Sequence, residues 1–75
     1  MKPTYDVIGS NGPYDQRVCY TSVKKRFAVR VADAISREGC SFFDGHRFFQ
    51  TVQVFKTGAT LGHLVHTASQ EVSRG

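Results

Sequence analysis

One helical segment, with β-type sequence on both sides of it, limits the folds that this chain can adopt. The apolar positions of residues 21–39 recur mostly at every fourth residue: Val23, Phe27, Val31 and Ile35, with Ala28 and Ala34 at the sides. At about 100° per residue, these positions form one broad apolar arc. A helix with one such face needs a second layer to cover it, and the flanking strands can supply that layer.

Hydroxyl and glycine residues mark the ends of this helix. Thr21 or Ser22 can cap the N-terminus, because a short hydroxyl side chain accepts a hydrogen bond from a free backbone N–H. Gly39 can adopt the left-handed conformation with which many helices end. The sequence therefore predicts a helix that starts after one of these hydroxyl residues and stops at Gly39.

The residues before the helix predict a β-hairpin. Residues 4–9 are rich in β-branched and aromatic side chains, and residues 14–20 contain a second such run. Between them lies Asn11-Gly12, which is a strong turn signal. We expect the two segments to pair as antiparallel strands.

The residues after the helix return to β patterns. Residues 40–43 lead into Asp-Gly at 44–45, a second hairpin signal, and residues 47–56 form the best strand of the chain. Both faces of that strand carry phenylalanine, so the alternation does not identify the buried face. A turn at 57–59 and an alternating strand at 60–67 complete the pattern.

Together these segments predict an α+β fold in the order ββαβββ, with one helix packed across an antiparallel sheet of four to five strands. A chain of 75 residues is long enough for one core, so we expect a single domain over residues 1–75. Residues 68–75 are polar and we expect them to fray. Because a core of this size gives marginal stability, docking on a partner or a homodimer would help.

The cysteine and histidine residues show no recognised catalytic or metal-binding spacing. His63 and His66 are close in sequence, but on a strand their side chains point to opposite faces. Cys19 and Cys40 are too far apart for a zinc knuckle, and the sequence leaves open whether they meet in the fold. The glycine-rich segments lack the phosphate-loop and dinucleotide signatures. The sequence therefore predicts no enzyme activity, no metal site and no cofactor.

The N-terminal residues contain no apolar signal region, and no segment approaches transmembrane length. Two cysteines also make a poor disulfide framework for a small secreted domain. We expect a cytoplasmic protein of a bacterial cell, with reduced thiols and no membrane partner.

Cationic residues on the helix are the most informative functional feature. Arg26, Arg30 and Arg37 fall on one helical side, and Lys24 and Lys25 lie at the first turn, where they oppose the helix dipole. One interpretation is a solvated face, with Asp33 paired to an arginine three or four residues away. The other is a binding surface, formed by Lys25 and the three arginines.

Two kinds of partner suit such a surface. The formal net charge of +4 excludes an acidic DNA mimic that acts through bulk negative charge. Phosphate backbones attract lysine and arginine, and aromatic side chains can stack on bases. Alternatively, arginine and tyrosine anchor many protein interfaces, which makes Tyr5 and Tyr20 candidate anchors beside the cations.

The segment Ala34-Ile35-Ser36-Arg37-Glu38-Gly39-Cys40-Ser41-Phe42, with Met1-Lys2, Tyr5 and the order of elements, resembles the small type I-F anti-CRISPR proteins of phages and mobile elements. The resemblance covers about the first two thirds of the chain. It implies a non-enzymatic inhibitor that binds a crRNA-guided surveillance complex (a Cas effector) and blocks target DNA.

The sequence thus favours a non-catalytic inhibitory binding protein. Direct binding of DNA or RNA through the same basic residues is the alternative. A third interpretation is a small phage or plasmid regulator that acts as a dimer.

Overall fold

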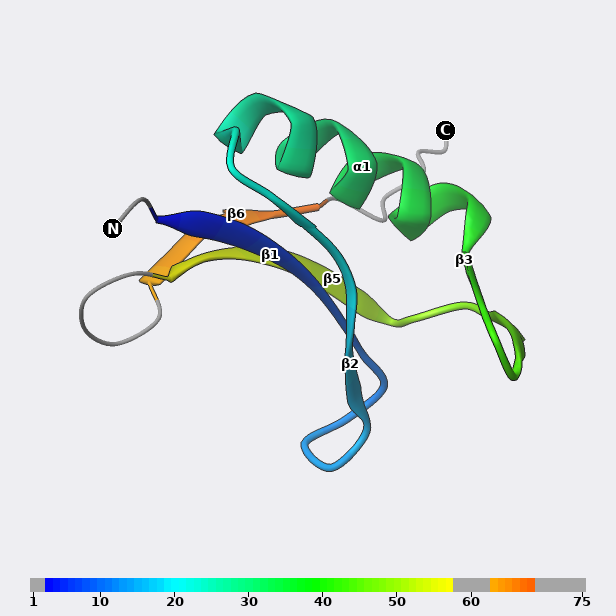
Figure 1. Ribbon diagram of the computed structural model, residues 1–75. Helices are drawn as coiled ribbons and strands as arrows, with labels where there is room; N and C mark the ends of the chain where they lie inside the picture. The colour runs from blue at the N-terminus through cyan, green and yellow to red at the C-terminus, as the bar shows by residue number, and fades with distance from the viewer. Residues whose placement is uncertain (1–2, 58–62, 69–75) are drawn as a thin grey trace, which may run out of the picture.

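The computed structural model describes residues 3–57 and 63–68 (Figure 1). Its elements follow in the order β1 (Thr4–Ser10), β2 (Gln16–Ser22), α1 (Lys25–Glu38), β3 (Cys40–Phe42), β4 (Gly45–Arg47), β5 (Thr51–Thr57) and β6 (His63–Thr67).

The strands form an antiparallel sheet in the order β2-β1-β5-β6, and α1 lies across one face of it (Figure 1). The short strands β3 and β4 pair with each other in a separate two-stranded sheet beside the C-terminal end of α1. The predicted α+β fold, with one helix on an antiparallel sheet, is therefore confirmed. The predicted hairpin of residues 4–9 and 14–20 is confirmed as the β1–β2 pair.

The long strand predicted at 47–56 is wrong, because the chain divides it into β4 and β5. The Asn11 side chain holds residues 48–50 outside both strands: its Nδ2 donates to the Phe48 carbonyl, and its Oδ1 accepts from the Gln50 backbone N–H. Val52 and Val54 of β5 are fully buried, which identifies the face that the sequence left open.

The end of the chain adds β6 to the sheet edge. The predicted turn at 57–59 and strand at 60–67 fall partly on residues 58–62, which lie outside the described residues. Ala68, placed in the expected fraying tail, is buried, and its backbone N–H donates to the Val52 carbonyl at 2.8 Å. The other residues of that predicted tail, 69–75, lie outside the described residues.

The predicted N-cap of the helix is wrong, whereas the predicted end is confirmed. Lys24 occupies the N-cap position without a side-chain cap, and Ser22 ends β2 instead. The Ser22 hydroxyl accepts a hydrogen bond from the Lys24 backbone N–H, so it orders the turn that precedes the helix. At the other end, Gly39 has a φ of 80° and donates its N–H to the Ile35 carbonyl.

Small side chains make the contact between α1 and the sheet. Ala28, Ala32 and Ile35 are the buried residues of the helix, whereas Val23 and Phe27 are 60% and 41% exposed. The buried face of the helix is therefore rotated away from the centre of the predicted apolar arc, toward the alanines. Alanines let the helix backbone approach the sheet closely, which the phenylalanine ring would prevent.

A glycine on β1 makes room for the largest buried side chain of the loop before β5. Phe49 is 4% exposed, and its ring lies 2.5 Å from the position that a Cβ on Gly9 would occupy. Any side chain on Gly9 would therefore overlap the ring. The contact between Gly9 and Phe49 therefore packs β1 against the segment that connects β4 to β5.

We predict that Gly9→Ala lowers the free energy of unfolding by about 1–3 kcal/mol, the usual cost of overpacking a core. The measurement is urea denaturation of the purified variant. In a Phe49→Leu background, which removes the ring, the same substitution should cost clearly less. An equal cost in both backgrounds would contradict the assigned contact.

Candidate binding surface on the helix

A shallow groove of about 740 Å³ follows the N-terminal half of α1. Its lining combines four cations with one apolar and one acidic side chain: Lys24, Lys25, Arg26, Val29, Arg30 and Asp33. We refer to Lys24, Lys25, Arg26 and Arg30 as the basic face.

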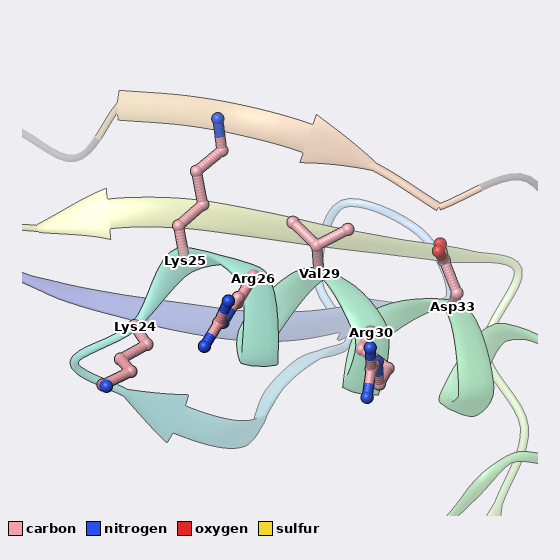
Figure 2. Close-up of a pocket in the computed structure, with 6 residues that line it drawn as sticks. All are labelled: Lys24, Lys25, Arg26, Val29, Arg30 and Asp33. Atoms are coloured by element: carbon pink, nitrogen blue, oxygen red, sulfur yellow. The ribbon is translucent and has the colours of Figure 1, made fainter.

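The lining side chains leave α1 in two directions (Figure 2). Lys25, Val29 and Asp33 point toward β6, as their spacing of four residues requires. Arg26 and Arg30 form a second row that points to the opposite side of the helix, away from β6. Positive charge therefore borders an apolar strip, a combination that suits a partner with both anionic and apolar groups.

The acidic residue of the groove does not neutralise the basic face. The Asp33 carboxylate pairs with His66 of β6, with 3.1 Å between Oδ1 and Nε2. Arg37 donates to the backbone carbonyl of Asp33 rather than to its carboxylate. The ion pair predicted between Asp33 and a helix arginine is thus absent, and the reason is the nearby histidine from another element.

Two arginines outside the basic face, in contrast, are paired with acidic side chains. Arg17 pairs with Asp44 at 3.1 Å, and Arg47 pairs with Asp15 at 2.9 Å. Within residues 3–57 and 63–68, no member of the basic face has an acidic side chain within 4.0 Å. Most of the described cations without an acidic partner therefore lie at the first half of α1, with Arg37 in its last turn and Lys56 on β5 as the others.

The N-terminal end of a helix carries a partial positive charge from its free N–H groups. The first turn of α1 contains no acidic residue, and Lys24, Lys25 and Arg26 surround it instead. These cations oppose the helix dipole and cost stability. The stability of the helix therefore gives no reason for their position.

Phe27 is a functional candidate that the sequence interpretation missed. Its half-exposed ring lies between two cations, with Lys24 Nζ at 5.9 Å and Arg26 Cζ at 5.5 Å from the ring centroid. These cation–π contacts add an aromatic side to the basic face. The signal in the sequence was the pair of cations adjacent to the ring, but we interpreted the ring as part of the core.

The structure brings together only some of the predicted binding residues. Lys25, Arg26 and Arg30 line the same groove. Arg37 lies in the last turn of α1, outside the groove lining. Tyr5 is half-buried and packs against the core, whereas Tyr20 on β2 remains 39% exposed.

A serine–histidine pair lies at the other end of the helix. The Ser41 hydroxyl and His46 Nδ1 are 2.9 Å apart, and His46 Nε2 is 2.9 Å from the Glu38 carbonyl. In this arrangement, the Nε2–H of His46 donates to the Glu38 carbonyl. The carbonyls in the last turn of a helix have no intrahelical N–H partner, so this hydrogen bond satisfies one of them. The pair joins the β3–β4 hairpin to α1, so its geometry is that of a helix cap.

The two cysteines, whose proximity the sequence left open, meet in the fold. Their side chains are within hydrogen-bonding reach, and both pack against the core. Burial, with the neighbouring Cys40 thiol as the next cause, raises the pKa of Cys19 to about 11. In the described part of the chain, no group of three or more His, Cys, Asp or Glu residues is arranged to hold a metal ion.

Comparison with known proteins identifies no relative: no family model, no curated protein and no solved structure matches the chain. Among the described residues, no helix has the length and apolar character that crossing a membrane requires.

We predict that Lys25→Glu stabilises the fold by about 1 kcal/mol at low salt, because it replaces an unfavourable charge at the helix N-terminus with a favourable one. Thermal and urea denaturation of the variant measure this change. Added salt should reduce the gain, since exposed charges are screened. A loss of stability would show that Lys25 has an internal partner.

Proposed function

We propose that this chain is a non-catalytic inhibitory binding protein, which occupies an anionic surface of a protein complex that handles nucleic acid. The observation that carries the proposal is the basic face: four cations without acidic partners in the described residues, three of them at the N-terminal end of the helix, where they reduce stability. A partner with negative charge reverses this unfavourable electrostatic term on binding.

The apolar part of the groove favours a protein complex over bare nucleic acid. Val29 lies between Lys25 and Asp33 in the row that points toward β6 (Figure 2). Phe27 adds a half-exposed ring near Lys24 and Arg26. Contacts to phosphates alone need charge but no apolar strip. Protein interfaces, in contrast, combine arginine and aromatic anchors with an apolar centre.

The resemblance to type I-F anti-CRISPR proteins supplies the candidate partner, a crRNA-guided surveillance complex. A small rigid domain that covers the site of target DNA inhibits such a complex without chemistry. The basic face would then contact surface groups that carry negative charge, whether from acidic side chains or from the bound RNA.

We predict that the protein blocks target-DNA binding by a purified type I-F surveillance complex, and that Arg26→Glu with Arg30→Glu abolishes the effect. A gel-shift assay with labelled DNA measures the inhibition. The protein is incubated first with the complex and, separately, with the DNA alone. Inhibition only in the first order of addition supports docking on the complex.

Two results would contradict this proposal. Retention of the DNA by the protein alone, with steep weakening as salt increases, would favour direct nucleic-acid binding through counterion release. Full inhibition by the doubly reversed variant would show that the basic face has no role. A pull-down from bacterial lysate, with and without nuclease, distinguishes a protein partner from nucleic acid in an unbiased way.

A matched pair of substitutions tests whether the groove or the whole arginine side of the helix binds. We predict that Arg30→Gln weakens binding to the complex by tenfold or more, whereas Arg37→Gln changes it by less than threefold. Each figure is an order of magnitude, roughly that of one charged contact at an interface. Both variants remove one charge from the same helix, so net charge is controlled. Equal losses would extend the binding surface to the last turn.

A further inference from the structure

Cys19 lies where the pairing between β1 and β2 is irregular. Val7 of β1 pairs with Tyr20 of β2, but the next residue, Ile8, pairs with Val18. Cys19 is therefore the extra residue of a β-bulge and has no partner on β1. The Cys19 side chain lies on the inner face of β2, between the exposed Val18 and Tyr20, and packs against the core.

Cys40 follows α1 in the sequence, whereas Cys19 precedes it, and the fold brings the two side chains together. Cys40 is the first residue of β3 and follows Gly39, whose positive φ turns the chain back toward the sheet. Its thiol contacts the Cys19 thiol, and both side chains are partly buried against one core cluster. Neither cysteine is part of the basic face.

We propose that Cys19 and Cys40 form a reversible intramolecular disulfide when the chain meets a low-molecular-weight disulfide such as oxidised glutathione. The thiols lie in contact in the folded state, on backbone segments fixed by a bulge and by a helix end. The bond would close a loop that contains all of α1.

The reaction takes two exchange steps. One of the two cysteines, as its thiolate, attacks one sulfur of oxidised glutathione, so the S–S bond of the reagent breaks and one glutathione thiolate leaves. The other thiol then loses its proton to solvent, and its sulfur attacks the Sγ that carries the glutathione, releasing the second glutathione thiolate. Two protein thiols are oxidised to one disulfide, and one glutathione disulfide is reduced to two thiols.

The exchange depends on pH through the two thiols. Burial raises the pKa of Cys19 to about 11, so that thiol is protonated at neutral pH. Both steps should accelerate as the pH increases, because each needs a thiolate.

The bond would join the edge strand β2 to the segment that leaves α1. Because the helix lies between the two cysteines, oxidation ties both of its ends to the sheet. The unfolded chain loses conformational freedom, so the folded state is stabilised. Oxidation would also hold the basic face in place, a consequence that rests on the proposed function.

The test measures the thiols of the full chain in glutathione buffers of increasing oxidation. After quenching with N-ethylmaleimide, intact mass spectrometry counts the free thiols. We expect a change from two labelled thiols to none, in a monomer without bound glutathione. The oxidised form should melt about 10 °C higher than the reduced form, and dithiothreitol should reverse the change.

Single substitutions separate the two cysteines. Cys19→Ser and Cys40→Ser should each accumulate a stable glutathione adduct on the remaining cysteine, because no second thiol is present to release it. Two free thiols at every glutathione ratio, a disulfide-linked dimer, or retained glutathione on the wild-type chain would each overturn the proposal. None of these measurements involves a partner, so failure here is distinct from failure of the proposed function.

Discussion

The close packing of α1 on the sheet through Ala28 and Ala32 is the contact on which the rest of this structure depends. Both alanines are fully buried against β1 and β5, where Val7, Val52 and Val54 supply the facing side chains. This contact sets the rotation of the helix about its axis. The rotation in turn places the basic face on the outside and leaves the Phe27 ring at its border.

Local patterns predicted the elements of the fold because their signals are local. Asn11-Gly12 predicted the first hairpin, and Gly39 predicted the helix end, since backbone conformation at these positions depends on the residue itself. The rotation of the helix was not predictable in the same way. The apolar arc was broad enough for either Phe27 or Ala28 to face the sheet, and only the spacing between the layers selects the smaller side chain.

Contacts between residues far apart in sequence explain the other differences. The strand pattern of 47–56 continues through residues 48–50, but Asn11 takes the backbone groups of that segment. Similarly, helical spacing offers Asp33 to Arg37, but His66 from β6 reaches its carboxylate. The cations of the candidate site were visible in the sequence, whereas their lack of acidic partners is a property of the fold.

The distribution of charge gives the strongest argument about function. At the end of the molecule that carries the β1–β2 turn and the β3–β4 hairpin, Arg17 and Arg47 are each matched by an aspartate. At the N-terminal end of α1, lysine and arginine stand together against the helix dipole, without a capping side chain. A chain that needed these cations only for solubility would be more stable with them at the C-terminal end of the helix. Their position weakens the fold at this end of the helix, and the proposed binding of an anionic surface would offset that cost.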